Sequence, residues 1–255
     1  MDGKQTYREL STRYGLSKKT IQKRLDAITV EQPIIDPRAT VVVMDTIYFG
    51  RTFGVMVFRD VERKKNIYWR IVRHETIKDY MDGIQYLQKC GWDITAIVCD
   101  GKRGIFKAFG NIPIQMCQFH QVAIITRYLT KKPRLEASKE LKNISQLLTQ
   151  TDKESFIGLL NDWHHKWENF LKEKTIREPI KKWNYTHKRL RSAYRSLKTN
   201  LPFLWTWYDN PELKIPNTTN SLEGIFSSLK TKLRVHAGLK IQRKIKAINQ
   251  VLSAN

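Results

Sequence analysis

Residues 40–47 read TVVVMDTI, an apolar run rich in β-branched residues that contains one carboxylate, Asp45. Two similar runs follow at residues 52–58 and 66–72, with turn-forming residues between them. Strands at this spacing predict an antiparallel meander. A carboxylate inside so apolar a strand is costly to bury unless a cation compensates its charge. Asp45 is therefore a candidate functional residue.

After this meander, the pattern predicts alternating helices and strands. Residues 76–90 have the periodicity of an amphipathic helix, and residues 93–99 read as a buried strand that ends at Asp100. A short helix, a strand and a further helix follow at residues 103–109, at residues 112–117 and from Gln118. Three antiparallel strands extended by two parallel ones through crossover helices form a mixed sheet. We therefore expect an α/β (α+β) fold with a ribonuclease H-like five-stranded sheet.

Residues 121–215 differ from the segment before them, because they are helical in pattern and rich in Lys, Arg and Trp. We interpret residues 125–215 as an α-helical insertion that divides the ribonuclease H-like core into residues 40–124 and 216–255. Pro211 and Pro216 predict a loop at the end of the insertion. Two helices are expected after it, over residues 219–233 and 240–252.

Residues 1–30 predict a helix-turn-helix, and residues 31–39 predict a linker. Gly15 supplies the turn, and Ser17 is a good N-cap for the second helix. Apolar side chains fall where a small helix-turn-helix would bury them: Leu10, Leu16, Ile21 and Leu25. The second helix is expected to expose polar and basic side chains that are typical of a DNA-recognition helix: Lys18, Lys19, Thr20, Gln22, Lys23 and Arg24. An ordinary helical hairpin with a solvated basic face is the alternative.

The formal net charge of +22 favours a polyanionic partner, since counterion release from phosphates drives such binding. Residues 121–255 carry 26 basic and 11 acidic residues, whereas residues 1–120 carry 20 and 13. Double-stranded DNA is the expected partner, and a basic ribosomal protein is the alternative.

The three cysteines, Cys90, Cys99 and Cys117, form no disulfide framework. No apolar run approaches the roughly 20 residues of a membrane span, and the N-terminus lacks a signal sequence, so we expect a cytoplasmic protein.

Two more carboxylates complete a candidate metal site. Asp100 ends its strand after Ala96-Ile-Val-Cys99, and Glu223 lies in the helix expected to begin at the capping segment Asn217-Thr-Thr-Asn220. The strands that carry Asp45 and Asp100 are neighbours in the expected sheet, and the helix could bring Glu223 to the same edge. Three carboxylates at one point need hard divalent cations, typically Mg²⁺ or Mn²⁺. Two such ions could serve an in-line displacement at phosphorus. Taken singly, each residue could also be a strand-end aspartate or a surface glutamate.

Four segments resemble the DDE transposases of the Mutator-like superfamily and their bacterial insertion-sequence relatives. They read VVVMDTIYFG, AIVCDGKRG, MCQFH and NTTNSLEGIFSSLK, and the resemblance spans about residues 40–235. It implies that Asp45, Asp100 and Glu223 are the catalytic, metal-binding triad, on a core with a helical insertion. The resemblance to bacterial relatives also implies that the protein is associated with the nucleoid of a bacterial host.

The resemblance also implies residues that contact DNA around the catalytic triad. Cys117 and His120 match the CxxH of the family, and Lys230 lies two helical turns beyond Glu223, on the same helix face. Thr218, Thr219 and Asn220 are expected near the DNA backbone. On chemistry alone, a lone CxxH could also be half of a zinc site, and Lys230 could be a solvated surface lysine.

These features together predict metal-dependent DNA cleavage and strand transfer at the ends of a mobile element. Pairing two ends implies at least a dimer on DNA. Two alternatives stay open: a ribonuclease H-like nuclease without strand transfer, and a non-catalytic DNA-binding regulator derived from a transposase. The regulator is expected to have lost an acidic residue of the triad, and all three are present.

Overall fold

The computed structural model describes residues 5–177 and 182–255. The chain forms two compact units: unit 1 consists of Met1–Asp93 and Asn220–Asn255, and unit 2 of Ile94–Thr219. No helix in these described residues is long and apolar enough to span a membrane.

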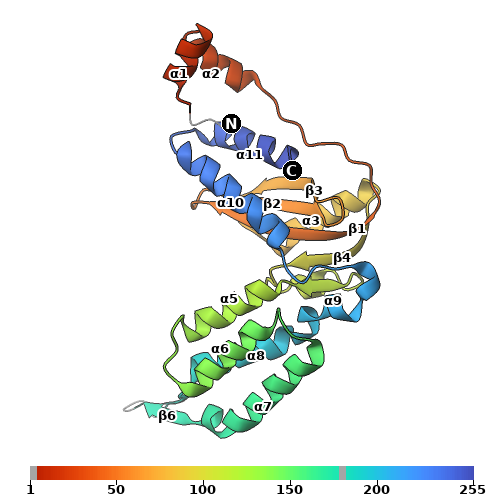
Figure 1. The fold of residues 1–255 in the computed structure, drawn as a ribbon, viewed down its shortest axis with the longest axis vertical. Helices are drawn as coiled ribbons and strands as arrows, with labels where there is room; N and C mark the ends of the chain where they lie inside the picture. The colour runs from red at the N-terminus through yellow and green to blue at the C-terminus, as the bar shows by residue number, and fades with distance from the viewer. Residues whose placement is uncertain (1–4, 178–181) are drawn as a thin grey trace. The chain divides into compact units, whose positions relative to one another are not determined.

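The chain contains a five-stranded mixed sheet with the strand order β3-β2-β1-β4-β5 (Figure 1). Strands β1 (Ala39–Phe49), β2 (Phe53–Asp60) and β3 (Lys65–Val72) are antiparallel to one another. Strands β4 (Asp93–Cys99) and β5 (Ile114–Met116) pair in parallel. The structure thus confirms the expected ribonuclease H-like arrangement of a meander extended by parallel strands.

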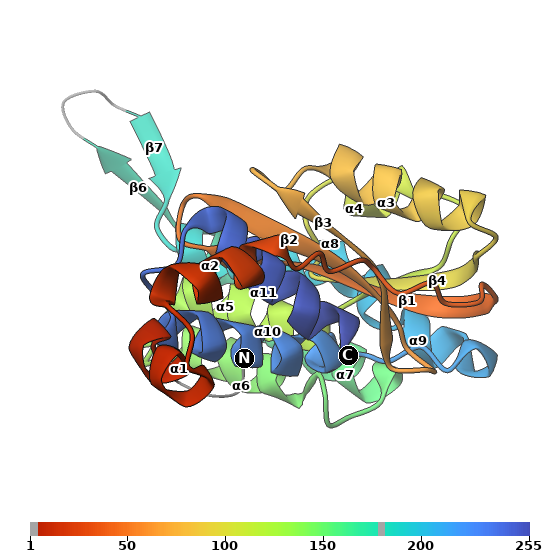
Figure 2. The ribbon, with the colours of Figure 1, turned by 90° about the horizontal axis from the view of Figure 1, so that it is seen from above.

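Helix α3 (Ile77–Lys89) covers one face of the meander in unit 1 (Figure 2). It begins with a capping box, in which Thr76 and Asp79 satisfy each other's backbone N–H groups. The Tyr80 hydroxyl lies 3.0 Å from the hydroxyl of Thr46 on β1. The aromatic ring of Phe58 on β2 packs directly on Gly83 of the helix. Thr46 and Phe58 therefore point to the α3 face of the sheet.

Helices α10 (Asn220–Val235) and α11 (Ile241–Ser253) cover the opposite face of the meander (Figures 1 and 2). The Trp69 indole N–H of β3 donates to Asn249 of α11 at 3.0 Å. The Asn66 amide donates to the Leu252 carbonyl, also at 3.0 Å. Helix α10 contacts β1. These contacts make the C-terminal helices part of unit 1, although more than a hundred residues separate them from the meander in the chain.

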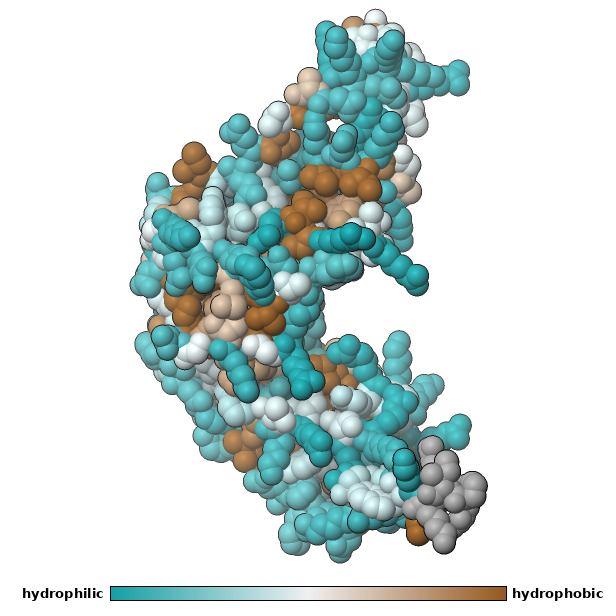
Figure 3. All heavy atoms as spheres, turned by 180° about the vertical axis from the view of Figure 1, so that it is seen from behind, coloured by the Kyte–Doolittle hydropathy of each residue, from teal (hydrophilic) through white to brown (hydrophobic). Residues whose placement is uncertain are grey.

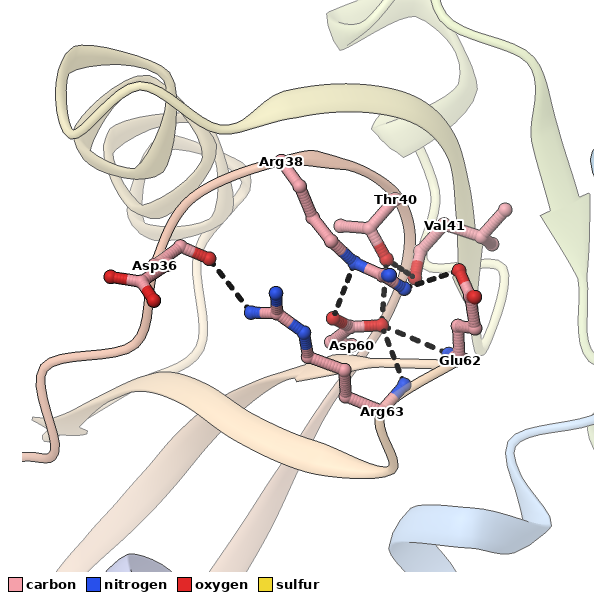
Figure 4. A network of polar contacts seen from close by, with 7 residues as sticks. All are labelled: Asp36, Arg38, Thr40, Val41, Asp60, Glu62 and Arg63. Atoms are coloured by element: carbon pink, nitrogen blue, oxygen red, sulfur yellow. Dashed lines mark hydrogen bonds and ion pairs between the residues drawn. The ribbon is translucent and has the colours of Figure 1, made fainter.

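A buried carboxylate fixes the point where the chain enters β1 (Figure 4). Asp60 is fully buried and accepts hydrogen bonds from the Thr40 hydroxyl at 2.8 Å and from the Glu62 amide at 2.9 Å. The Arg38 guanidinium lies 3.5 Å from the other Asp60 oxygen and also pairs with Glu62. This shared carboxylate holds the end of β2 against the start of β1.

The predicted helix-turn-helix is present as α1 (Tyr7–Tyr14) and α2 (Lys18–Ala27). Gly15 adopts a left-handed φ of 63° between them, and the Ser17 hydroxyl accepts the Thr20 N–H at the start of α2. The predicted apolar core of this pair is only partly confirmed. Ile21 is buried, but Leu25 is 40% exposed, which corrects the expectation that it would be buried. Two short helices do not enclose four apolar side chains without further cover.

Unit 2 contains the helical insertion, as expected. Its helices are α4 (Ile105–Ala108), α5 (Gln118–Leu129), α6 (Glu136–Leu147), α7 (Lys153–Lys172), α8 (Lys188–Leu204) and α9 (Thr206–Asp209), with a 3₁₀ turn, η1 (Pro211–Leu213). Apolar side chains from α5 to α8 form one core, in which Leu141, Phe156, Leu197 and Trp205 are fully buried. The turn η1 lies where the prolines predicted an irregular loop.

The insertion also contains a β-hairpin that the helical pattern did not predict. Strands β6 (Lys174–Arg177) and β7 (Lys182–Tyr185) pair antiparallel as a separate two-stranded sheet. Each strand has only four residues, so the segment is too short for strand periodicity to stand out among charged residues. The expectation of helix throughout residues 121–215 was wrong at this point.

Candidate active site

Asp45 lies in β1 within the buried meander of unit 1. Asp45 is half-buried, whereas Met44 and Ile47 on the same strand are buried. One carboxylate oxygen of Asp45 accepts the Thr46 N–H at 2.7 Å. Asp45 is directly opposite Val57 on β2, and Val57 is opposite Trp69 on β3. Residues directly opposite one another point to the same face of a sheet.

This row of three residues identifies the face on which Asp45 lies. Trp69 reaches α11 through its indole N–H, and Thr46, the next residue after Asp45, reaches α3. Because side chains alternate between the faces along a strand, Asp45 points to the α10–α11 face and not to the α3 face. The position of Asp45 in the alternation of β1 therefore places its carboxylate on the face covered by the C-terminal helices.

Glu223 lies in the first turn of α10 and is exposed. Its helix contacts β1, the strand that carries Asp45, on the same face of the sheet. Leu222, Ile225, Phe226 and Leu229 are the buried residues around it, so the buried face of the helix is apolar and Glu223 lies at the border of that face. Unit 1 therefore presents two of the three predicted carboxylates on neighbouring elements.

Asp100 follows β4 directly, at the start of unit 2, and is half-buried. Its carboxylate accepts the Lys102 N–H at 3.1 Å. Gly101 has a φ of +80°, and a Cβ at this position would lie 2.6 Å from the sulfur of Met116 on β5. Glycine is therefore required here by both backbone conformation and space. This sharp turn ends β4 and holds the carboxylate at the carboxyl edge of the sheet.

Cys117 and His120 lie beside this edge, immediately after β5. The Cys117 N–H donates to the Cys99 carbonyl at 2.8 Å, which continues the β4–β5 pairing up to Asp100. Burial works to raise the pKa of the fully buried thiol, but hydrogen bonds from His120 and Thr219 lower the pKa below its ordinary value. The Thr219 amide and hydroxyl each lie 3.4 Å from the sulfur.

These contacts give Cys117 and Thr219 a packing role. Both side chains are fully buried, and Asn217 and Gln118 add two hydrogen bonds of 3.0 Å between the same segments. The CxxH thus anchors the TTN segment that precedes α10. The predicted DNA contacts of Cys117, His120, Thr218, Thr219 and Asn220 stay predictions. Lys230, also predicted to contact DNA, is exposed on α10.

The predicted recognition residues of α2 are largely accessible. Lys18, Lys19, Lys23 and Arg24 are exposed, whereas Thr20 and Gln22 are half-buried. On the face drawn in Figure 3, hydrophilic side chains predominate, and apolar ones occur in separate small groups. The four exposed cations are suited to phosphate contacts.

A clamp between α2 and α11 was not predicted from the sequence. The Arg243 guanidinium binds both carboxylate oxygens of Asp26, at 2.7 Å each, and donates to the Tyr7 hydroxyl at 3.0 Å. The hydrogen bond from Arg243 lowers the pKa of Asp26. More than two hundred residues separate the partners in the chain, so local patterns carry no signal for this pair. The clamp attaches the helix-turn-helix to the C-terminal helices within unit 1.

The attachment should weaken in acid. Because the pKa of Asp26 is lowered in the folded state, its contribution is present above the ordinary aspartate pKa and is lost as the pH falls through the lowered value. We expect the protection factors of α1 and α2, which are corrected for the intrinsic pH dependence of amide exchange, to fall several-fold as the pH drops from 5 to below the ordinary aspartate pKa. Asp26→Asn should show this low protection already at pH 7. Hydrogen exchange with mass spectrometry measures both. An unchanged rate in Asp26→Asn at pH 7 would show that the clamp does not hold the helices.

No family model matches the chain, and no curated protein matches it either. One similar solved structure is a cryoEM structure of the simian T-cell lymphotropic virus intasome in complex with PP2A regulatory subunit B56 gamma. The identity is 9%, the TM-score is 0.24, and the similarity covers 73% of this chain and 62% of that chain. The chain thus spans less than two thirds of that neighbour. Similarity at this level carries no functional argument, and the class defined by the fold is a ribonuclease H-like mixed α/β protein.

Proposed function

We propose that the chain is a DDE transposase that cleaves DNA at the ends of a mobile element and joins them to target DNA. The observation that carries the proposal is the position of its acidic residues in the fold. Asp45 lies in β1, Asp100 ends β4, the neighbour of β1 in the strand order, and Glu223 lies in a helix that contacts β1. We propose that these three carboxylates are the metal ligands of one catalytic site.

The chemistry of the residues fits hard divalent cations. All three proposed ligands are carboxylates, and oxygen ligands are those that Mg²⁺ and Mn²⁺ prefer. Asp45 is held half-buried in an apolar strand, where a cation would offset the cost of its charge. Two bound ions would supply Lewis-acid activation and charge neutralisation at the scissile phosphate.

The remaining residues would bind and orient DNA. Exposed Lys18, Lys19, Lys23 and Arg24 of α2 are suited to the terminal repeat, with Arg243 holding that helix on unit 1. The basic insertion would bind the flanking DNA, and Lys230 would contact the strand near the cleaved phosphate. The Tyr48 hydroxyl accepts the Glu75 N–H at 2.6 Å. The proposed mechanism requires no covalent protein–DNA intermediate. Pairing of two ends would require at least two copies of the chain.

A strand-transfer assay tests the proposal. The full chain is incubated with Mg²⁺, a plasmid target and the DNA that flanks its gene. We expect cleaved ends with 3′-hydroxyls and products in which those ends are joined to the plasmid, and neither product in EDTA. Cleavage without joining would favour the nuclease alternative. Binding without either reaction would favour the transposase-derived regulator.

A further inference from the structure

Trp183 differs from the other tryptophans of the insertion. Trp163 and Trp205 are buried in the core of unit 2, at 3% and 0% exposure, and Trp167 and Trp207 pack against that core. Trp183 lies on the β6–β7 hairpin and is 52% exposed. Solvent exposure of so large an aromatic ring needs an explanation, because the helical core uses its other indoles for packing.

One face of the hairpin combines exposed apolar surface with positive charge. Ile176 is directly opposite Trp183 and is 64% exposed, and Lys174 is directly opposite Tyr185. The ammonium group of Lys174 lies 4.1 Å from the centre of the Trp183 ring. The rings of Trp183 and Tyr185 meet edge to face, with their centroids 5.4 Å apart. The pairing register places all four side chains on the same face.

Basic residues of α8 continue this surface. The Arg191 guanidinium lies 3.5 Å over the Tyr185 ring. Arg191, Arg195 and Lys198 recur at helical spacing, so they occupy one side of α8. With Lys172, Tyr185 and Tyr194 they line a pocket of about 360 Å³. The acidic residue at this pocket, Glu168, is paired with Lys172 at 2.7 Å.

We propose that this surface, formed by Lys174, Ile176, Trp183, Tyr185, Arg191, Arg195 and Lys198, binds single-stranded nucleic acid. An unpaired base stacks on Trp183, and the adjoining phosphates lie along the cations of α8. Aromatic rings beside a basic groove are the usual means of single-strand binding. Bases inside a duplex are already stacked on both sides, so the indole selects an unpaired base. The inference rests on the proposed function for the choice of nucleic acid as partner.

The charge of the surface decides between nucleic acid and a protein partner. A hydrophobic protein contact would use Ile176 and Trp183, but it would leave Arg195 and Lys198 without an opposite charge. A nucleic acid strand satisfies both halves of the surface, because each nucleotide offers a flat base and a phosphate. Stacking depends little on base identity, so we expect weak sequence preference.

Binding of the full chain to a fluorescein-labelled oligothymidylate and to a duplex of equal length tests the proposal. We expect Trp183→Ala to weaken single-strand binding about tenfold or more and to change duplex binding less than about twofold. Trp183→Phe, which keeps an aromatic ring, should retain most of the affinity. Arg195→Ala should weaken both and reduce the salt dependence by about one ion. Tyr86→Ala, which removes a 50% exposed ring of α3, is the matched control.

Each outcome decides one point. Equal single-strand affinity in Trp183→Ala and Tyr86→Ala overturns the inference, as does equal loss for both DNA forms or an equal loss in Trp183→Phe. If the strand-transfer assay fails while Trp183→Ala still loses single-strand binding, the proposed function falls and the binding surface stands. If strand transfer succeeds without any Trp183 effect, only the surface falls. A wild-type chain that binds no nucleic acid overturns both.

Discussion

Glu223→Gln is expected to lower the rate of Mg²⁺-dependent DNA cleavage by on the order of a thousandfold or more, with DNA affinity unchanged within about twofold. Glutamine keeps the size of the side chain and removes only its charge, so the loss reports metal binding. Glu223 is exposed in the first turn of α10, and its replacement leaves the buried face of that helix intact. Single-turnover cleavage of labelled DNA, with filter binding in parallel, measures both quantities.

Asp45→Asn and Asp100→Asn should show losses of the same order, and the double variants should lose little more. Ligands of one site act as a unit, so their effects do not add. Asp162→Asn, which changes an exposed carboxylate of α7, is the control and should cleave like wild type. If Glu223→Gln cleaved at the wild-type rate, the shared metal site would be refuted, and the cleavage would have to come from other residues.

The fold could be predicted largely because its signals are local. The apolar runs of β1 to β4 gave strands close to the observed bounds, and β4 matches residue for residue. The N-terminal helices also matched, since Gly15 and Ser17 mark their ends by backbone conformation and capping. The β6–β7 hairpin was missed because its four-residue strands consist mostly of polar and aromatic residues without a buried face.

The site could be predicted only in part. Asp45 and Asp100 stand out as carboxylates within or directly after apolar strands, whereas Glu223 is an exposed helical glutamate that a motif, not its surroundings, singled out. No local sequence pattern marked Arg243, Asp26 or Trp183 as functional. Their roles depend on contacts between distant segments or on the solvent exposure of the side chain. Neither can be predicted from a few neighbouring residues in the sequence. Composition alone does not separate Trp183 from the buried Trp205.

Gly83→Ala is expected to destabilise unit 1 by about 1–3 kcal/mol, although alanine is the better helix former. The new Cβ would lie 2.1 Å from the Phe58 ring and cannot be accommodated without movement. Phe58 is fully buried, and the rings of Tyr68 and Tyr80 lie 5.6 and 6.3 Å from it, so the ring has little room to move. Helix α3 would have to shift away from the sheet. Thermal and urea unfolding followed by circular dichroism measure the loss.

Gly158→Ala in α7 separates this packing effect from helix propensity. Nothing lies within 4 Å of a Cβ at that position, so alanine should stabilise the chain by up to about 1 kcal/mol. A second test combines Gly83→Ala with Phe58→Leu. Each change alone should destabilise, but together they should cost less than the two single losses, because leucine vacates the space that the new methyl group needs. Additive losses, or a gain in stability for Gly83→Ala alone, would mean that α3 does not pack on β2 at this distance and that the α3 face of the sheet is wrongly assigned.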